Sequence, residues 1–349
     1  MGFFDKLFGK SRQGVNTTET PRQPNESNTE EGNSESAADK GQNKQGKQAD
    51  RQADTLKFDA IRAMKLGELG FALSALEKSL ELRDEFEARY YYVEALLMAS
   101  RQDEALSQMD LLLDEEPNHL PTLLGRSQLL LHLNRYSDSM ADADKGIELQ
   151  TATEQEKDDL NLYQLSILKA KALRGLERTS EAIELLAKTA QQHEEIGQTH
   201  LLKAEMEIAI GRKEDATDSL LQAGALLPEE ERVPLLLAQI AESDNVIDKA
   251  FKLYQDALDL NPFCVEALCA KANLRYKQGE WEQAIAMLTE AKEGMAPSKE
   301  LLLTLIDLHT KLGQTTEAEA LRSELKENET GSSTTKKNSF DNLYSGGIY

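Results

Sequence analysis

The side chains most capable of chemistry in this chain are five histidines and two cysteines. A metal site or a catalytic base needs several such groups held together in one pocket. At His193 the order His-Glu-Glu does not set a second histidine one helical turn away, as the zinc-binding HExxH motif does. No glycine-rich phosphate loop, CxxC pair or GxSxG turn is present, and the other histidines are scattered at His119, His132, His200 and His309. We therefore expect a protein that is not an enzyme, with no catalytic residue, no cofactor and no metal ion.

The two cysteines give the same answer. Cys264 and Cys269 are five residues apart on one predicted helix, so they point to different faces and cannot readily bridge. We interpret them as two small buried hydrophobic residues rather than a redox or metal-binding pair.

The elements that would position any site follow from small residues that recur along the chain. The intervals are 33 or 34 residues, with one of 43, and the residues are Ala72, Ala105, Ser139, Ala182, Ala216, Ala250, Ala284 and Ala318. Most are followed by a large residue four positions later and by a small one seven positions later. Such positions share one helical face, so the pattern predicts the second helix of a repeated helical hairpin. Small side chains let two helix backbones cross at about 8 Å.

Glycine and proline mark the ends of these helices. A glycine stands five residues before the small residue in four repeats, at Gly67, Gly211, Gly279 and Gly313. That is where the first helix must end, and glycine adopts the left-handed conformation there without steric cost. Prolines follow second helices and block their continuation, at Pro117, Pro228, Pro262 and Pro297.

These motifs resemble the tetratricopeptide repeat family. The runs LGELGFA at 66–72 and QGEWEQA at 278–284 match the family's turn and small-residue motif, and DALDLNP at 256–262 matches its closing motif. The resemblance covers about residues 53–326 and implies an all-α, right-handed superhelical solenoid of about eight hairpins. Arg322 stands where a large apolar residue is usual, which suits a terminal hairpin with a wet outer face.

Composition sets the expected domain limits. We expect a short amphipathic segment at 1–12, a disordered polar linker at 13–52 and a disordered tail at 327–349, because polar tracts cannot bury enough apolar surface to fold. The expected hairpins are 53–86, 87–119, 120–153, 154–196, 197–230, 231–264, 265–298 and 299–326.

The interval of 43 residues holds an insertion near Thr151 to Asn161. The run Thr-Glu-Gln-Glu at 153–156 is typical of a capping box, so the first helix of the fourth hairpin should start near Glu154 and run to about Arg174. Two interpretations are open. The insertion is either a tolerated variation in length or a break that divides the array into three and five hairpins.

Charge narrows the class of partner. The chain has 62 Asp and Glu against 40 Lys and Arg, a net charge of −22, and nearly all of it falls on residues 53–326. A strongly acidic body repels the phosphate backbone, so we expect no nucleic acid partner. The charge either keeps a long surface soluble or steers basic partners toward it.

The family resemblance implies where a partner would bind. Its first helices line a concave face that takes extended or helical peptides. The matching positions here are Tyr90, Glu94, Leu97, Leu124, Gln128, Leu131, Ile167, Lys171, Arg174, Leu201, Glu205, Ile208, Leu235, Gln239, Asn273 and Tyr276. An apolar lining flanked by Gln, Asn and Glu suits an amphipathic partner segment. Alternatively, some of these residues pack against neighbouring hairpins or the chain's own tails.

One subclass of the family fits poorly. Its co-chaperone members clamp a partner's terminal carboxylates with lysine, asparagine and arginine from three consecutive hairpins. Lys57 matches the first clamp lysine, but Ile61 and Tyr91 stand where the clamp asparagines belong. We therefore expect that the partner is not a carboxylate-clamp chaperone.

The first residues form a separate candidate for docking. Phe3, Phe4, Leu7 and Phe8 share one helical face, with Lys6, Lys10 and Arg12 beside them. This pattern is typical of a short interfacial segment on anionic lipid; docking on a partner protein or in the chain's own groove are the alternatives. No run approaches the roughly 18 apolar residues of a membrane span, and no leader pattern is present. We expect a cytoplasmic protein, with this segment able to hold it at the inner face of the plasma membrane.

Together these features predict a non-catalytic protein-binding scaffold or adaptor. It would bind a peptide or helical segment of a protein partner in its groove and attach peripherally to a membrane. The alternative is a structural assembly factor that associates with copies of itself.

Overall fold

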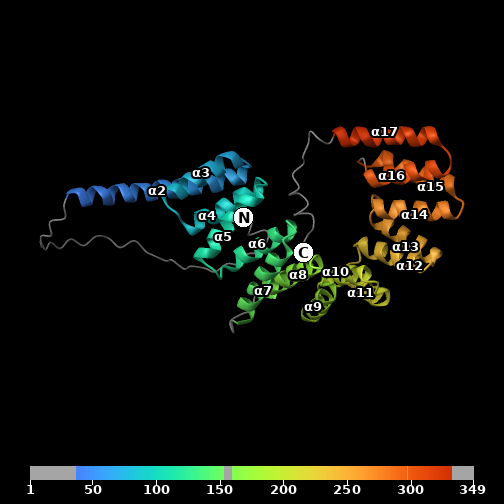
Figure 1. Cartoon of the computed structure of the whole chain (residues 1–349), viewed down its shortest axis with the longest axis horizontal. Coiled ribbons are helices and arrows are strands. Elements are labelled where there is room, and N and C mark those ends of the chain that lie inside the picture. The colour runs from blue at the N-terminus through green and yellow to red at the C-terminus, as the bar shows by residue number, and fades with distance from the viewer. Residues whose placement is uncertain (1–36, 153–158, 297, 332–349) are drawn as a thin grey trace. The chain divides into compact units, whose positions relative to one another are not determined.

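The computed structural model describes residues 37–152, 159–296 and 298–331 of the chain (Figure 1). Those ranges contain sixteen α-helices and no strand. The expected all-α class is therefore confirmed.

The helices follow one another as eight hairpins, each with a first and a second helix. The pairs are α2 (Ala37–Leu66) with α3 (Leu69–Leu82), α4 (Phe86–Met98) with α5 (Gln102–Glu115), α6 (Leu120–His132) with α7 (Tyr136–Ala152), α8 (Asp159–Gly175) with α9 (Thr179–Gln192), α10 (Gly197–Ala209) with α11 (Lys213–Leu226), α12 (Arg232–Ser243) with α13 (Ile247–Leu260), α14 (Val265–Lys277) with α15 (Trp281–Gly294), and α16 (Lys299–Lys311) with α17 (Thr315–Gly331).

The hairpins belong to two compact units, residues 1–165 and 166–349. We call them the N-terminal and the C-terminal unit. The boundary falls inside α8, the helix that follows the insertion. The predicted start of this helix, Glu154, lies outside the described residues, and its end at Gly175 is one residue beyond the predicted end.

The first helix differs from expectation at its start. It begins at Ala37, inside the segment 13–52 that we expected to be a disordered linker. Low hydrophobicity indicated that this segment could not bury itself, but Ala, Gln and Lys are strong helix formers. The residues from Ala37 onward extend α2, which is already held in place farther along by the buried residues Ala53, Lys57 and Ala60. Their helix therefore needs no new nucleation.

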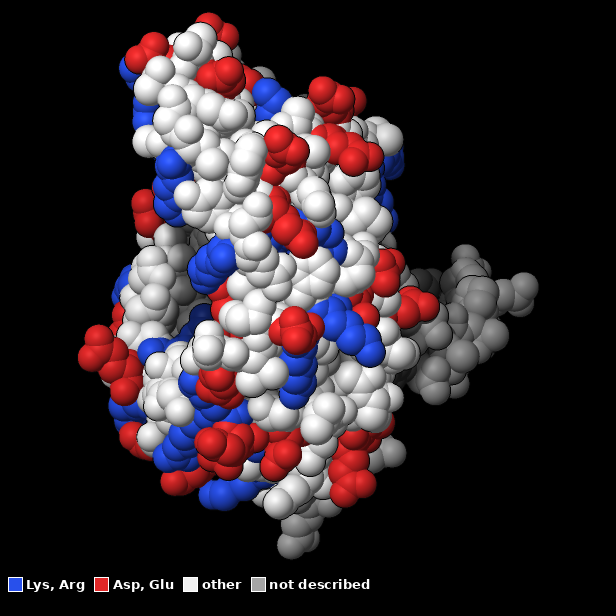
Figure 2. Space-filling model, turned by 90° about the vertical axis from the view of Figure 1, so that its right-hand side faces the viewer, with Lys and Arg blue, Asp and Glu red and all other residues white. Residues whose placement is uncertain are grey.

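Charged side chains are mixed on the surface. On the face drawn in Figure 2, acidic and basic groups alternate with uncharged ones, without a continuous basic track.

The recurring small residues lie at the crossing between the two helices of each hairpin. All eight, from Ala72 to Ala318, are at most 1% exposed. The residue four positions after each small residue is equally buried in seven hairpins. In the eighth hairpin this residue is Arg322, which is exposed at the end of the array. We call these buried positions the seam.

The third hairpin has an unusual seam, because both of its seam residues, Ser139 and Ala143, are small, and so is Gly146, seven positions after Ser139. Ser139 replaces the alanine, and its hydroxyl donates to the carbonyl of Ser127 at 2.8 Å while the Ser127 hydroxyl donates to the carbonyl of Ser139 at 2.9 Å. This exchange satisfies both buried hydroxyl donors. A Cβ at Gly146 would stand 2.6 Å from Cδ2 of Leu165, so only glycine fits that position without a shift of Leu165.

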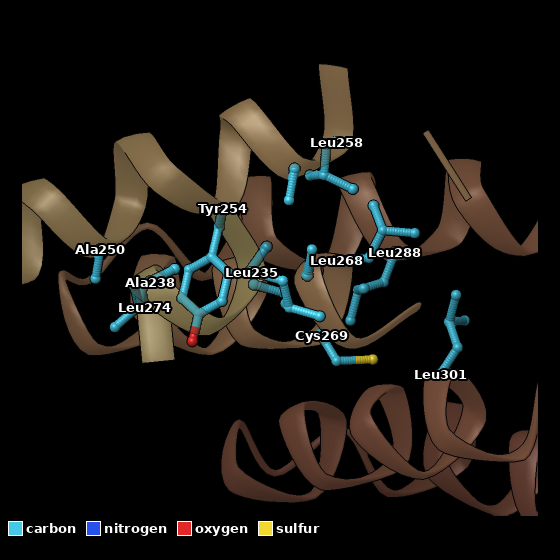
Figure 3. Close-up of a cluster of buried hydrophobic side chains, with 14 of the residues drawn as sticks. Leu235, Ala238, Ala250, Tyr254, Leu258, Leu268, Cys269, Leu274, Leu288 and Leu301 are labelled. Carbon is cyan, nitrogen blue, oxygen red and sulfur yellow. The ribbon is translucent and has the colours of Figure 1, made fainter. Parts of the chain in front are cut away.

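The seam merges with a larger core in the C-terminal unit. Figure 3 shows the ring of Tyr254 directed toward Leu235, Ala238 and Leu274, with Leu288 and Leu301 farther along the same cluster. The Tyr254 hydroxyl donates to Oε2 of Glu242 at 2.9 Å. A tyrosine therefore fills the place of the usual leucine without leaving its hydroxyl unsatisfied.

Every hairpin turn contains one residue in the left-handed conformation. The four predicted glycines have φ between 74° and 83°. The other four turns hold Ser100, Asn134, Glu177 and Asn245 at φ of 59° to 61°. The amide that follows each of these residues closes the turn; for example, Arg178 N donates to Leu173 O at 2.9 Å. The geometry is the same in all eight turns, so the four non-glycine residues hold it at a steric cost.

Replacing Glu177 with glycine should therefore stabilise the C-terminal unit by about 0.5–1 kcal/mol, after allowing for the greater freedom of glycine in the unfolded chain. The matched control is Glu184→Gly, an exposed site inside α9 with ordinary helical geometry, where glycine should destabilise by about 1 kcal/mol. Urea denaturation followed by circular dichroism measures both. A lower midpoint for Glu177→Gly would contradict the assigned strain.

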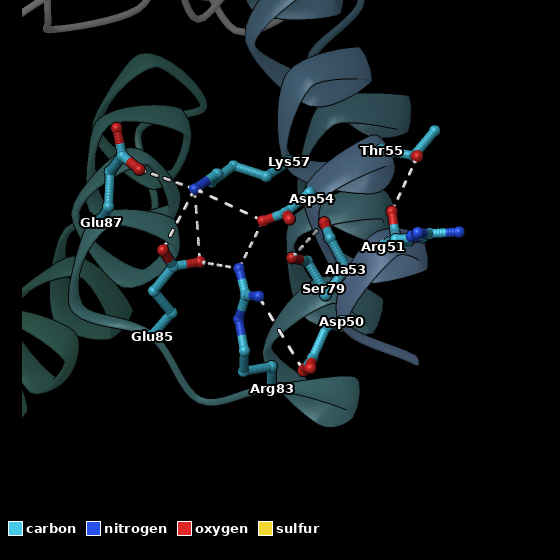
Figure 4. Close-up of polar contacts among 10 residues, drawn as sticks. All are labelled: Asp50, Arg51, Ala53, Asp54, Thr55, Lys57, Ser79, Arg83, Glu85 and Glu87. Atoms are coloured by element: carbon cyan, nitrogen blue, oxygen red, sulfur yellow. Dashed lines mark hydrogen bonds and ion pairs between the residues drawn. The ribbon is translucent and has the colours of Figure 1, made fainter. Parts of the chain in front are cut away.

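A network of charged side chains joins the first two hairpins (Figure 4). Lys57 of α2 is 3% exposed, and its Nζ lies 2.6 Å from Oε2 of Glu87 and 3.2 Å from Oε1 of Glu85. Arg83, after α3, donates to Glu85 at 2.6 Å and also to Asp54 of α2. Burial tends to raise the pKa of Glu85, but the hydrogen bonds from Arg83 and Lys57 outweigh it and lower that pKa. Glu85 thus bridges two cations and ties α2, α3 and α4 together.

Replacing Glu85 with glutamine should destabilise the N-terminal unit by about 1–2 kcal/mol at pH 7, because the site is only partly buried. The pKa of Glu85 lies below its ordinary value of 4.5, so its contribution is complete above that pH and is lost as the pH falls through the lowered pKa. The difference in urea midpoint between wild type and Glu85→Gln should therefore shrink as the pH is lowered from 6 to 3. A difference that stays constant would show that the carboxylate charge is not what stabilises this junction.

Candidate functional site

The sixteen residues expected to form the groove occupy three recurring positions of the first helices. The structure divides them into two groups. Six are buried and pack inside the array: Glu94, Leu97, Leu124, Ile167, Leu201 and Leu235. The other ten are half-buried or exposed: Tyr90, Gln128, Leu131, Lys171, Arg174, Glu205, Ile208, Gln239, Asn273 and Tyr276.

The prediction of an apolar lining is therefore wrong for most of the leucine and isoleucine positions. Leu201 and Leu235 belong to the core clusters of the C-terminal unit. They occupy the earliest of the three positions, whose side chains are buried in the first helices from α6 to α14; at the same position Tyr90 of α4 is half-buried and Leu303 of α16 is exposed. The predicted groove side chains that remain accessible to solvent are mainly polar. We use the term first-helix face for the accessible side chains of the first helices.

In the N-terminal unit the first-helix face carries an aromatic contact. The ring of His119 lies 4.8 Å from that of Phe86 and 5.6 Å from that of Tyr90, both edge to face, and its Nδ1 is 2.7 Å from the hydroxyl of Thr122. Burial lowers the pKa of His119, which favours the neutral ring at pH 7. These contacts join α4 to the start of α6, so Tyr90 is engaged in packing as well as facing solvent.

In the C-terminal unit one polar residue per hairpin occupies the same register. These residues recur every 34 positions: Lys171 in α8, Glu205 in α10, Gln239 in α12 and Asn273 in α14. All four are half-buried or exposed. We call them the polar row.

Two of these residues belong to a denser group of charges. Glu205 accepts from Arg232 at the start of α12, and its Oε2 lies 3.8 Å from Nη1 of Arg174. Lys171 is close enough to both arginines and to Glu205 for their charges to act on it. Burial is the main cause that lowers the pKa of Lys171, and the positive charges of Arg174 and Arg232 lower it further, against the opposing effect of Glu205. We call Lys171, Arg174 and Arg232 the cationic cluster.

Arg232 is not among the positions that the sequence pattern predicts for the groove. It stands three residues before Leu235 on α12, hence on the same helical face. Extending the predicted positions one turn toward the helix start would have identified it.

Farther along the same face, Asn273 lines a shallow hollow with side chains of α16. The hollow has a volume of about 460 Å³, and its other lining residues are Lys299, Glu300, Leu303, Thr304 and Asp307. Leu303 is 46% exposed. The ring of Tyr276, also on α14, has the ammonium of Lys311 5.5 Å from its centre. This region offers polar and apolar contacts together, and its charges are mixed.

Other candidates from the sequence are placed as follows. Cys269 is buried and Cys264 half-buried, and burial raises the pKa of both thiols, that of Cys269 to about 11. Both are therefore protonated and unreactive at pH 7. Phe3, Phe4, Leu7 and Phe8 lie outside the described residues. Within the described ranges no helix has an apolar stretch long enough to cross a bilayer, and no three His, Cys, Asp or Glu side chains are grouped to hold a metal ion.

Comparisons with known proteins bear on the fold and the family. The family model described as tetratricopeptide repeat matches residues 235–299. A tetratricopeptide repeat protein from Parabacteroides merdae is similar in structure, with a TM-score of 0.56, 15% identity, and coverage of 74% of this chain and 99% of that chain. Yeast Tom70 aligns with a TM-score of 0.47, 20% identity, and coverage of 82% of this chain and 57% of Tom70. A comparison with curated protein sequences gives no match.

The matched segment, residues 235–299, includes α13, α14 and α15. The seam and the left-handed turn that it contains recur in the other hairpins at intervals of 33 or 34 residues, with one interval of 43. The structural likeness to the Parabacteroides protein extends the same fold over most of the chain. Residues 235–299 are therefore similar to tetratricopeptide repeats, and the described hairpins have the fold of a tetratricopeptide repeat protein.

Proposed function

We propose that this protein is a non-catalytic scaffold or adaptor whose first-helix face binds a segment of a partner protein. The observation that carries the proposal is the polar row. Lys171, Glu205, Gln239 and Asn273 are accessible at one register of four consecutive hairpins, where the seam does not need them. Long polar side chains lose rotamer freedom when they are fixed, so a row of them on an ordered face is suited to hydrogen bonding with a ligand.

The spacing of the row fits an extended protein segment. Packed helices lie about 8–10 Å apart, and an extended chain advances about 3.3 Å per residue. Neighbouring row positions would therefore contact about every third residue of a bound segment. Half-buried Ile208 and Tyr276, from the last of the three groove positions, supply apolar contact beside the row. Recognition of this kind combines polar contacts with a few apolar anchors.

Two classes of partner fit less well. The net charge of −22 and the mixed surface disfavour nucleic acid. Capture of a terminal carboxylate at the first hairpin, as in the chaperone-binding members of the family, is opposed because Lys57 already contacts Glu85 and Glu87. A partner's carboxylate would have to displace the carboxylates of Glu85 and Glu87 from Lys57.

The partner face is tested by capture from native lysate with the full chain. Leu201 and Leu235 are unsuitable for substitution, because a lysine at either buried site would disrupt the core. Gln239→Lys with Asn273→Lys changes the row at accessible sites and should abolish capture of a stoichiometric protein. The matched control, Gln191→Lys with Gln222→Lys on the exposed surfaces of α9 and α11, should capture it as well as wild type does. Equal capture by both double variants would contradict the proposed face.

The alternative role, a self-associating assembly factor, makes a different prediction for the same proteins. Exposed apolar residues on second helices and in the connections, such as Leu221 at 60% and Phe263 at 57%, are the surfaces that would serve it. A monodisperse monomer in sedimentation velocity would count against this role.

Attachment to a membrane at the inner face of the plasma membrane, with the protein otherwise cytoplasmic, is a separate part of the proposal. It rests on Phe3, Phe4, Leu7 and Phe8, with the basic residues beside them. Full-length protein should float with liposomes that contain anionic lipid, and deletion of residues 2–10 should reduce flotation severalfold. Flotation that is unchanged by the deletion would contradict the membrane role of this segment.

A further inference from the structure

The first-helix face of the C-terminal unit contains a local excess of positive charge in a strongly acidic protein. Arg174 of α8 and Arg232 of α12 form ion pairs with a single carboxylate, that of Glu205 in α10, and Lys171 of α8 is close enough for the charges of all three to act on it. The group carries two more positive than negative charges. It lies at one end of the polar row, since Lys171 and Glu205 are members of both.

Lys171 differs from the buried lysines of this chain. Lys57 contacts the carboxylates of Glu85 and Glu87, and Lys271 donates to Gln255 and lies 4.7 Å from the ring centre of Phe251. In the described ranges no carboxylate lies within ion-pair distance of Lys171, although burial and two neighbouring guanidiniums act against its charge. An anion that binds next to such an ammonium stabilises its positive charge.

Glu205 indicates what kind of anion the cluster accepts. Its carboxylate accepts from Arg232 and stands at the limit of ion-pair distance, 3.8 Å, from Arg174. Arg174 and Arg232 have side chains that are 50% and 53% exposed, so both can also turn toward a ligand. The two guanidiniums are therefore already arranged around one carboxylate, with Lys171 beside them.

We propose that the cationic cluster binds an internal aspartate or glutamate of the partner segment, and that Glu205 is a built-in counter-ion that limits the strength of this contact. The inference rests on the proposed function and assigns the chemistry of the same face. The ligand carboxylate would contact Lys171 and share the guanidiniums of Arg174 and Arg232 with Glu205. Charge-assisted hydrogen bonds of this type are stronger than neutral ones and favour carboxylate geometry.

The surroundings favour a protein segment over a phosphate chain. Glu230 and Glu231 directly precede Arg232, and they accept from Gln198 and Asn261. These carboxylates would repel a phosphate chain, which has a negative charge at every nucleotide. They tolerate a protein segment that brings only one or two carboxylates to the cationic cluster. Ile208, half-buried three residues after Glu205 on α10, lies next to the cluster and offers an apolar contact. The expected ligand is a segment with an acidic residue close to an apolar one.

The test begins with selection of randomised, terminally capped peptides on the full chain. Enriched peptides should share an aspartate or glutamate near an apolar residue. One enriched peptide, labelled with a fluorophore, is then titrated against variants by fluorescence anisotropy. Lys171→Gln should weaken binding about tenfold, and raising the salt concentration should weaken wild-type binding in the same direction.

The decisive variant is Glu205→Gln, which removes the built-in counter-ion. It should bind the acidic peptide severalfold more tightly than wild type, a gain that damage to the fold could not produce. Lys188→Gln, an exposed lysine on α9 away from this face, is the control for loss of one positive charge and should leave the affinity unchanged.

The outcomes separate the inference from the proposed function. Enriched peptides without acidic residues, or acidic peptides whose affinity does not respond to Lys171→Gln, would overturn the inference and leave the scaffold function standing. Weaker binding by Glu205→Gln would overturn the counter-ion role. If no peptide of any composition is enriched, the peptide-binding face fails and the inference fails with it.

Discussion

The close approach of two helices at a small side chain is the contact on which this structure depends. In each hairpin one alanine or serine is buried at the crossing, and large residues one turn later fill the space beside it in most hairpins. A larger side chain at the crossing would force the helices apart at a cost of about 1–3 kcal/mol. Because each hairpin packs only on its neighbours, this cost would be repeated wherever the pattern failed.

The position of every other element follows from that crossing. The turn must reverse the chain within a few residues, so one residue of each turn is left-handed, whether it is Gly211 or Glu177. The accessible side chains of the first helices are those that neither the crossing nor the neighbouring hairpin covers. In the C-terminal unit they form the polar row. The proposed binding surface thus consists of the side chains that remain accessible after the packing requirements have been met.

The sequence was informative wherever a backbone constraint selects a residue type. Small residues at a fixed interval predicted the seam, and glycines predicted four of the eight turns. The other four turns were missed because Ser100, Asn134, Glu177 and Asn245 carry no comparable signal and are held in place by the surrounding structure. The helix from Ala37 was missed because composition indicated disorder, whereas helix propensity prevailed on a helix that was already docked.

The candidate site was harder to predict than the fold. Helical spacing identifies which residues share a face but not how much of that face a neighbouring hairpin covers. Leu201 and Glu205 are four residues apart on the same face of α10, yet the first is buried in the core and the second reaches solvent. The grouping of Lys171, Arg174 and Arg232 around Glu205 depends on contacts between three hairpins, which no local pattern contains.

The central claim is that the accessible side of the first helices, and not the second-helix surface, contacts a partner protein. It is tested most directly by site-specific photo-crosslinking, with a photoreactive residue at Gln239 of α12 or, in a second protein, at Gln222 of α11; both sites are exposed. The account predicts a discrete crosslinked protein from position 239 and none from position 222. A crosslink from position 222 alone, or none from either, would contradict it.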